Sequence, residues 1–310
     1  MNDQPTFDPE LEEVRRRIDE IDEQLISLLN ERAKAAIEVG KIKSQTGGSP
    51  TYAPEREQQV LEHVRQVNPG PLPDSCLEAV YRELMSGSFA LQRPLRIGYL
   101  GPAGSFSHLA ATRQFGSSVE YADVDDIPGV FSAIERDLID LGLVPIENST
   151  GGGITETLDS FLQFSAIVCA EVLIPVHHNV LSRAEADGIT RVYSRPEIFD
   201  QCRKWLSDHL QSAERMPVSS SAKAAQIARD EPGAAAVGST LAGDIYGLPA
   251  VFTNIEDNRN NITRFFVIGR RRPKRSGYDK TAIMFTTAHK PGALADVLDV
   301  FRQHKVNLTH

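Results

Sequence analysis

Near the N-terminus, apolar residues recur at intervals of three and four, which is the spacing of one helical face. No glycine or proline lies between residues 11 and 39. The pattern predicts one long helix over residues 8–43, whose apolar face needs a partner helix to cover it. The positions that form this face are Leu11, Val14, Ile18, Ile21, Leu25, Leu28, Ala35, Val39 and Ile42.

Two shorter helical patterns follow, over residues 55–67 and 75–92, with loops rich in proline and glycine between them. After residue 94 the period changes, and short apolar runs alternate with helical ones, as is typical of an α/β fold with two small lobes. Strands are predicted over residues 95–100, 141–146, 166–176, 234–238 and 263–269. Helices are predicted over residues 107–115, 127–137, 154–164, 196–210 and 221–230.

The end of the chain changes character again. Residues 270–279 form a charged linker, and the residues after it predict a strand, a loop, a helix and the start of a second strand. So short a piece buries little surface, so we expect it to be the first part of a domain. The predicted domains are therefore 1–93, all helical; 94–272, α/β; and 278–310.

Composition limits what the chain can bind. The chain has 310 residues, 41% of them hydrophobic, and a net charge of -9, which argues against non-specific binding to nucleic acid or anionic membranes. Cys76, Cys169 and Cys202 lie far apart, so neither a disulfide framework nor a thiolate zinc site is predicted. No leader and no membrane-spanning run is apparent, which predicts a cytoplasmic protein.

Arg32 stands where the apolar pattern of the first helix expects a hydrophobic residue. Lys43, eleven residues later, lies about 20° from the same direction and roughly 16 Å along the axis, so both cations can reach one anion. Arg15 lies roughly 25 Å before Arg32 and reaches the same site only from an antiparallel second copy, which predicts a dimer. The alternative is that Arg32 snorkels to solvent and that residues 15–17 are an ordinary charged surface.

The helical segment resembles the all-helical chorismate mutases, in the form fused to prephenate dehydratase. The resemblance rests on "VRRRIDEIDEQLISLLNERAKAAIEVGKIK", "PEREQQVLEHV" and "ELMSGSFALQ". It implies that Arg15 comes from the partner chain, that Glu57 and Ser88 hold substrate hydroxyl groups or order the site, and that Gln92 faces the ether oxygen with Lys43. Ala53 departs from the family, which often has a carboxylate there. The implied site residues are Arg15, Arg32, Lys43, Arg56, Glu57, Ser88, Gln92.

The rearrangement of chorismate needs neither a nucleophile nor a metal, because one C–O bond breaks as one C–C bond forms within one molecule. The protein has to hold the reactive chair and stabilise negative charge on the ether oxygen. Fixed cations and two donors meet both needs. Gln92 donates without being protonated, so activity at neutral pH is expected. No cofactor is predicted.

Two polar motifs in the α/β segment end predicted strands. Gly98, Gly101 and Gly104 have neither dinucleotide-binding nor Walker A spacing, but the helix expected at Ser105 offers free N–H groups to a carboxylate. "VPIENSTGGG" places short polar side chains at a strand's C-terminal end, where α/β sheets bind ligands. There is no GxSxG elbow, and the adjacent histidines 177 and 178 lack the spacing of helical metal ligands, so no metal site is predicted.

"GPAGSFSHLAA", "VPIENSTGGG", "VYSRPEIFDQCRKW" and "NITRFFVIG" together resemble the signature regions of prephenate dehydratase. The resemblance implies two α/β lobes of the periplasmic-binding-protein type with substrate in the cleft, and Thr263 as the main catalytic group. A threonine hydroxyl can donate a hydrogen bond to the departing hydroxide without neutralising the carboxylate that leaves as CO2. Without the resemblance, an ordinary strand-edge threonine is the favoured interpretation of Thr263. Implied substrate-binding residues are Asn148, Ser149, Thr150, Gln201, Arg264, Phe265, with the hydroxyls of 219–221 as weaker candidates.

"HKPGALADVLDVF" and "VNLTH" resemble the opening of the α+β, ferredoxin-like ACT domain, which in this family senses phenylalanine. The resemblance assigns a regulatory role to Gly292, Ala293 and Leu294, where small side chains let an amino acid approach backbone amides. The family's next motif lies beyond His310, so feedback inhibition by L-phenylalanine is left open.

The sequence thus predicts a bifunctional enzyme of phenylalanine biosynthesis that converts chorismate to prephenate and prephenate to phenylpyruvate, as a homodimer or a dimer of dimers. Two alternatives stay open at this point. The helices could be only a dimerisation arm with a structural Arg32, or the two lobes could be a sensor that closes on a small acid without chemistry.

Overall fold

The computed structural model describes residues 8–45, 52–277 and 279–309. The chain forms two compact units, residues 1–276 and residues 277–310. The predicted helical and α/β segments both lie in the first unit. No helix among the described residues is long and apolar enough to cross a membrane.

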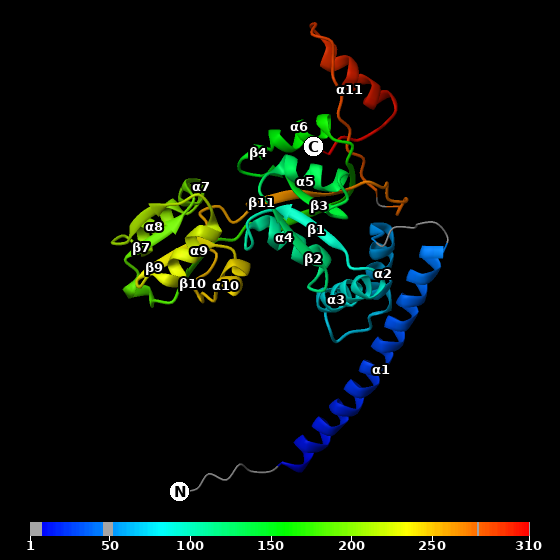
Figure 1. Cartoon of the computed structure of the whole chain (residues 1–310), viewed down its shortest axis with the longest axis vertical. Helices are drawn as coiled ribbons and strands as arrows, with labels where there is room; N and C mark the ends of the chain where they lie inside the picture. Colours follow the sequence, from blue (N-terminus) through cyan, green and yellow to red (C-terminus); the bar gives the residue numbers. More distant parts are fainter. Residues whose placement is uncertain (1–7, 46–51, 278, 310) are drawn as a thin grey trace. The chain divides into compact units, whose positions relative to one another are not determined.

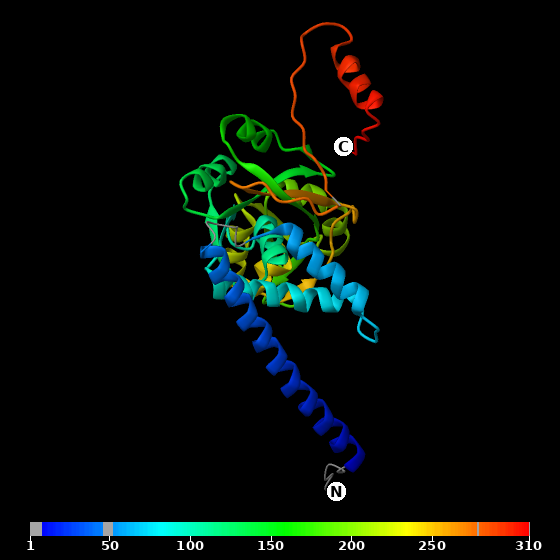
Figure 2. The same cartoon turned by 90° about the vertical axis from the view of Figure 1, so that its right-hand side faces the viewer.

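The helical segment consists of three helices, as predicted: α1 (Pro9–Gln45), α2 (Pro54–Val67) and α3 (Asp74–Gln92). Helix α1 contacts α3 only through its C-terminal half, and none of its residues is buried. In both views the N-terminal turns of α1, drawn in dark blue, extend away from α2 and α3 (Figures 1 and 2). The predicted apolar face is exposed along the whole helix, with Ile18 51%, Leu25 50% and Ile42 60% exposed. Within one chain this face therefore has no cover.

The first lobe is built on a six-stranded sheet in the order β2-β1-β3-β11-β5, with β4 paired to β3. Strands β1, β2 and β3 are parallel, whereas β11 is antiparallel to both of its neighbours, β3 and β5. Its elements are β1 (Arg96–Leu100), α4 (Phe106–Phe115), β2 (Glu120–Val124), α5 (Ile127–Glu135), β3 (Leu141–Asn148), β4 (Gly152–Gly153), α6 (Thr155–Gln163), β5 (Ile167–Pro175) and β11 (Ile262–Gly269).

The second lobe carries a separate sheet in the order β10-β6-β9-β7-β8. The chain enters this lobe after β5 and returns through β11, so two crossings connect the lobes (Figure 1). The two-lobed α/β arrangement expected from the sequence is thus confirmed. Its elements are β6 (Asn179–Ser182), η1 (Ala186–Gly188), β7 (Arg191–Ser194), α7 (Pro196–Gln201), α8 (Arg203–His209), β8 (Glu214–Pro217), α9 (Ser221–Asp230), β9 (Ala234–Gly238), α10 (Thr240–Tyr246) and β10 (Ala250–Phe252).

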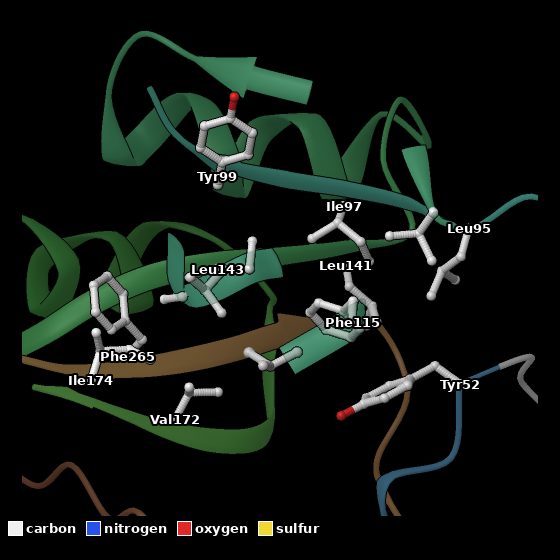
Figure 3. Close-up of a cluster of buried hydrophobic side chains, with 14 residues drawn as sticks. Tyr52, Leu95, Ile97, Tyr99, Phe115, Leu141, Leu143, Val172, Ile174 and Phe265 are labelled. Atoms are coloured by element: carbon white, nitrogen blue, oxygen red, sulfur yellow. The ribbon is translucent and has the colours of Figure 1, made fainter. Parts of the chain in front are cut away.

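The helical segment is joined to the first lobe by a shared core. Tyr52, which precedes α2, is 5% exposed and packs its ring edge-on against Phe115 of α4 and Phe89 of α3. Figure 3 shows this ring beside the side chains of the lobe, among them Leu95 and Leu141. Helix α3 also contacts the turn after α4, where Gly116 leaves room for Ser86. The two predicted segments therefore pack against each other and are not separate domains joined by a linker.

The second unit contains one helix, α11 (Ala293–Gln303), in the described residues 277 and 279–309. The predicted helix is confirmed, but the strands predicted on either side of it are not formed by the described residues. A strand needs a neighbour to satisfy its backbone hydrogen bonds, and the described part of this unit offers none.

Candidate active sites

A cavity of about 740 Å³ lies where the helical segment meets the first lobe. The volume falls within the roughly 300–1,000 Å³ usual for small-molecule sites. Lys43, Arg56 and Gln92, which the sequence predicts to share a site, all line this cavity. They come from α1, α2 and α3 in turn, so the packing of the three helices brings them together. Ala53 also lines it, at the position where the family often has a carboxylate.

The close approach of α1 to α3 depends on Gly40. A Cβ atom at this position would lie 2.8 Å from Gln92 Cγ, closer than real Cβ contacts. The missing side chain lets Gln92 lie against α1 beside Lys43. Burial lowers the pKa of Lys43; the Glu55 carboxylate opposes this shift and the nearby Lys274 ammonium adds to it.

Arg32 faces α3 rather than open solvent. Its Nη1 donates to Ser88 Oγ over 3.2 Å, and its guanidinium carbon lies 5.8 Å from the centre of the Tyr81 ring. Ser88 Oγ in turn donates to the backbone oxygen of Leu84 over 2.7 Å. Two of the predicted mutase residues, Arg32 and Ser88, are therefore in direct contact, although neither lines the 740 Å³ cavity.

Glu57 points away from the cavity and toward the first lobe. Gln114 of α4 donates from Nε2 to both Glu57 oxygens at 3.4 Å and to the Tyr52 hydroxyl at 3.3 Å. Burial raises the pKa of Glu57 to about 7, although the Arg82 charge and the Tyr52 hydroxyl oppose the shift. The sequence does not indicate this contact between segments, because residues 57 and 114 belong to different predicted domains.

Arg15 lies on the exposed N-terminal half of α1, where its Nη1 donates to Glu12 over 2.7 Å. Its side chain is 61% exposed. Within one chain Arg15 therefore stays far from Arg32. The helix geometry predicts this separation.

Seven charged residues that the sequence does not indicate also line the cavity, among them Glu55, Arg272 and Lys274. Glu55 Oε2 is buried without a hydrogen-bond partner among the described residues. The sequence does contain a signal for Glu55, because this carboxylate stands two positions after Ala53, where the family often has one. Arg272 and Lys274 carry no such signal, because only the fold places residues 270–274 beside Lys43 of α1.

The second predicted site centres on Thr263, which lies on β11 opposite Asn148 of β3. Asn148 Nδ2 donates to Thr263 Oγ1 over 2.9 Å and to Asn261 Oδ1 over 2.8 Å. Asn148 Oδ1 accepts the backbone N–H groups of Thr150 and Gly151, at 3.0 and 2.9 Å. These contacts fix the amide of Asn148, so its nitrogen faces Thr263.

The polar network continues into the second lobe. Asn261 Nδ2 donates to Gln201 Oε1 over 3.5 Å, and His178 Nε2 lies 2.8 Å from the same oxygen. Burial lowers the pKa of His178, with Gln201 and Glu256 opposing the shift, so the neutral ring with its proton on Nε2 donates to Gln201. Gln201 is thus held between both lobes, with its amide nitrogen left to act as a donor.

Ser149 and Thr150 lie at the edge of this network. Ser149 Oγ accepts the backbone N–H of Ile262 over 2.9 Å, and Thr150 lines a second cavity of about 270 Å³ together with Gln201 and Asn261. Five of the predicted dehydratase residues therefore gather at the junction of the lobes. They are Asn148, Ser149, Thr150, Gln201 and Thr263.

Arg264 and Phe265 lie apart from this cavity. Arg264 forms ion pairs with Glu171 at 2.9 Å and Glu147 at 3.5 Å. Phe265 is 1% exposed and lies in the core of the first lobe near Ile174 and Leu143, as Figure 3 shows. In this structure both side chains therefore hold strand β11 in its sheet rather than line the second cavity.

The glycine-rich turn after β1 meets the second lobe. Ser105 caps α4 by accepting the N–H of His108 over 3.2 Å, as predicted for a helix that begins there. Ser239, the cap of α10, donates to the backbone oxygen of Gly104 over 2.8 Å. Gly104 has a φ of +84°, and a Cβ atom there would lie 3.1 Å from Ala242 Cα, so this close approach of the lobes requires glycine. Among the weaker candidates, Ser220 caps α9.

The described residues contain no group of three or more His, Cys, Asp or Glu side chains that could hold a metal ion. His177 Nδ1 instead lies 2.8 Å from Glu256 Oε1. In the second unit, Gly292 precedes α11 with a φ of +84°, Ala293 is buried and Leu294 is exposed.

Comparison with known families matches each of the two segments to one family. The family model for chorismate mutase type II matches residues 14–93, and the model for prephenate dehydratase matches residues 97–273. A bifunctional chorismate mutase/prephenate dehydratase of Pseudomonas aeruginosa is 41% identical over 306 residues, which are 97% of this chain and 84% of that protein. The protein of the same description from Aquifex aeolicus is 40% identical over 305 residues, with the same coverage.

Solved structures of prephenate dehydratases are similar to the two lobes. Prephenate dehydratase from Arthrobacter aurescens, in complex with L-Phe, aligns with a TM-score of 0.59 and 28% identity, over 67% of this chain and 72% of that one. The enzyme from Staphylococcus aureus aligns with a TM-score of 0.56 and 26% identity, over 70% and 83%.

Proposed function

Because the chain belongs to the bifunctional chorismate mutase/prephenate dehydratase family, we propose that its two reactions take place at the two polar sites described above. The chain rearranges chorismate to prephenate and then decarboxylates and dehydrates prephenate to phenylpyruvate, in phenylalanine biosynthesis. The observation that supports one site for each reaction is their separation. Lys43 and Gln92 line one cavity, whereas Asn148 and Thr263 meet at the junction of the lobes.

In the mutase site, Lys43 and Gln92 donate to the ether oxygen of chorismate as its C–O bond breaks. Arg56 and Arg32 bind carboxylates and hold the substrate in its reactive chair. Ser88 positions Arg32, because the two side chains are 3.2 Å apart.

Glu55 takes the place of the carboxylate that Ala53 lacks. Its Oε2 is buried at the cavity without a hydrogen-bond partner among the described residues, so it can accept a hydrogen bond from the substrate hydroxyl. Glu57 orders the site from the other side of α2 through Gln114 and Tyr52.

The active mutase is a homodimer in which the partner chain supplies Arg15. The support is the exposed apolar face of α1, which one chain leaves uncovered over residues that include Ile18, Ile21 and Leu25. An antiparallel second copy of α1 covers this face and places its own Arg15 near Arg32. The mass of the assembly in solution distinguishes a dimer from a dimer of dimers.

In the dehydratase site, Thr263 donates a hydrogen bond to the hydroxyl group that leaves prephenate. As the bond between the ring and its carboxylate breaks, CO2 departs, the electron pair enters the ring, and the C–O bond releases hydroxide. Asn148 orients Thr263, while Gln201 and the loop at Ser149 bind the remaining polar groups of the substrate.

We assign the second unit, which contains α11, to the beginning of an ACT regulatory domain with Gly292, Ala293 and Leu294 at its amino-acid site. The support is the motif together with a turn at Gly292 that leaves the N-terminal amides of α11 without a side-chain cap. L-Phenylalanine is the proposed effector. A cytoplasmic location is proposed from the three free cysteines.

Separate assays of chorismate loss and phenylpyruvate formation test the two-site proposal. Arg32→Ala should abolish chorismate turnover and leave prephenate turnover unchanged, and Thr263→Ala should do the reverse. Parallel loss of both activities in either variant would contradict separate sites. Unchanged chorismate turnover in Arg32→Ala would leave the helices as a dimerisation arm only.

A further inference from the structure

The linker that follows β11 forms one wall of the mutase cavity. Residues 270–274 line it together with Lys43, Arg56 and Gln92. The linker therefore belongs to the surroundings of the site, although in sequence it follows the dehydratase lobes. A cation at these positions reaches the same space as the three helical residues.

The cavity has a large excess of positive charge, in a chain whose net charge is -9. Seven lysine and arginine side chains line it, against the two carboxylates of Glu55 and Asp140. Asp140 is already occupied by Arg93, with which it forms an ion pair at 2.5 Å. The lining thus contains far more cations than its own carboxylates can neutralise.

Two of the linker cations have no counter-charge among the residues that the structure describes. Arg270 pairs with Asp137. Arg272 and Lys274, by contrast, make no ion pair or hydrogen bond with any residue that the structure describes, and both are exposed. These two side chains can therefore turn toward a guest without breaking an existing contact.

Lys274 also lies close enough to Lys43 for the two ammonium groups to repel each other, and this repulsion contributes to lowering the pKa of Lys43. Two like charges that face one cavity destabilise it when it is empty and favour an anion between them. Chorismate carries two carboxylates, so it supplies the missing negative charge.

We propose that Arg272 and Lys274 are substrate-binding residues of the mutase site, where they bind a carboxylate of chorismate. The inference rests on the mutase site proposed above and adds to it two residues from outside the helical segment. A charged hydrogen bond of this kind changes binding by about tenfold.

The test compares Lys274→Gln and Arg272→Gln with Arg275→Gln in the full chain. Arg275 lies in the same linker and is exposed, but it does not line the cavity, so its substitution removes an equal charge from outside the site. We expect kcat/KM for chorismate to fall about tenfold in each of the first two variants and to stay unchanged in Arg275→Gln. Lys274→Arg, which keeps the charge, should retain most of the activity.

Two further measurements separate the possible outcomes. Prephenate turnover should be unchanged in all four variants, which shows that the lobes remain folded. The loss in Lys274→Gln should shrink at high ionic strength, because salt screens the attraction. Equal effects of Lys274→Gln and Arg275→Gln, or no effect of either, would overturn the inference. Lys43→Gln distinguishes this from a failure of the mutase site itself, because unchanged chorismate turnover in that variant would overturn the proposed site as a whole.

Discussion

Asn148 Nδ2 lies 2.9 Å from Thr263 Oγ1, and the register of β3 against β11 sets the two residues directly opposite each other. The amide nitrogen is a donor, so it occupies a lone pair of the threonine oxygen. The hydroxyl proton of Thr263 is then directed elsewhere and is available to a leaving hydroxide. The direction of this one hydrogen bond leaves the Thr263 hydroxyl free to act as the donor that the proposed role requires.

Asn148→Asp reverses the direction of that bond while keeping the shape of the side chain. The carboxylate of the variant accepts a hydrogen bond from the Thr263 hydroxyl, and it adds negative charge beside the departing hydroxide. We expect kcat for prephenate to fall about 10²–10³-fold, the usual cost of losing one oriented donor. Phenylpyruvate formation at saturating prephenate measures it.

Thr263→Ser supplies the control, because it keeps the hydroxyl and should retain far more activity than Thr263→Val. Chorismate loss should be the same in all three variants. Equal activity of the serine and valine variants would show that the hydroxyl has no part in the reaction.

Glu57 predicts a pH dependence of stability. Its pKa is about 7 in the folded chain, against an ordinary value of 4.5. Below pH 4.5 both states hold the proton, so the group has no effect. As the pH rises from 4.5 to 7 the unfolded chain releases its proton first, and the free energy of unfolding falls. Above pH 7 the loss is complete, at about 3 kcal/mol.

Glu57→Gln removes this buried charge, so the variant should unfold at higher urea concentration than the wild type at pH 8 and at a similar concentration near pH 4.5. Circular dichroism of the helices gives the midpoints. Glu62→Gln, on the same helix but without the Gln114 contact, is the matched substitution. A Glu57→Gln variant less stable than the wild type at pH 8 would show that the contact favours the carboxylate.

Gly40 and Gly87 form a matched pair for testing the position of Gln92. A methyl group at residue 40 meets Gln92 Cγ at 2.8 Å, whereas nothing lies within 4 Å of one at residue 87. Both lie in helices, where alanine in place of glycine raises the stability of the helix by about 0.5–1 kcal/mol. We therefore expect Gly40→Ala to lower kcat for chorismate at least tenfold and Gly87→Ala to leave it unchanged, as chorismate loss will show. Equal activities would mean that Gln92 can shift without cost.

The sequence predicts long periodic elements well and short polar ones poorly. The three N-terminal helices lie within a few residues of their predicted limits, because their apolar spacing extends over several turns. Strands β7 and β8, only four residues each, were missed, since Arg191–Ser194 and Glu214–Pro217 contain polar residues that indicate a loop when read alone. The predicted helix over 196–210 is divided into α7 and α8 at Cys202.

The sites follow the same rule. Asn148 and Thr263 each end or begin an apolar run, so motif and strand position together indicate them. Lys274 and Gln114 have no such pattern, because their importance arises from contacts between segments far apart in the sequence. Only the packing of the helices on the first lobe brings these residues to the mutase segment.

Mixing two inactive variants tests whether the partner chain supplies Arg15. In a mixed dimer of Arg15→Ala and Arg32→Ala chains, one site has both arginines and the other has neither. Random exchange makes about half of the dimers mixed, so we expect about a quarter of wild-type chorismate turnover to return, although each variant alone is inactive. Adding Leu25→Glu to both chains places a charge on the exposed apolar face and should prevent the recovery together with dimer formation, as measured by light scattering. Full activity of Arg15→Ala alone would show that Arg15 has no part in the site, and recovery without dimers would show that no partner chain is needed.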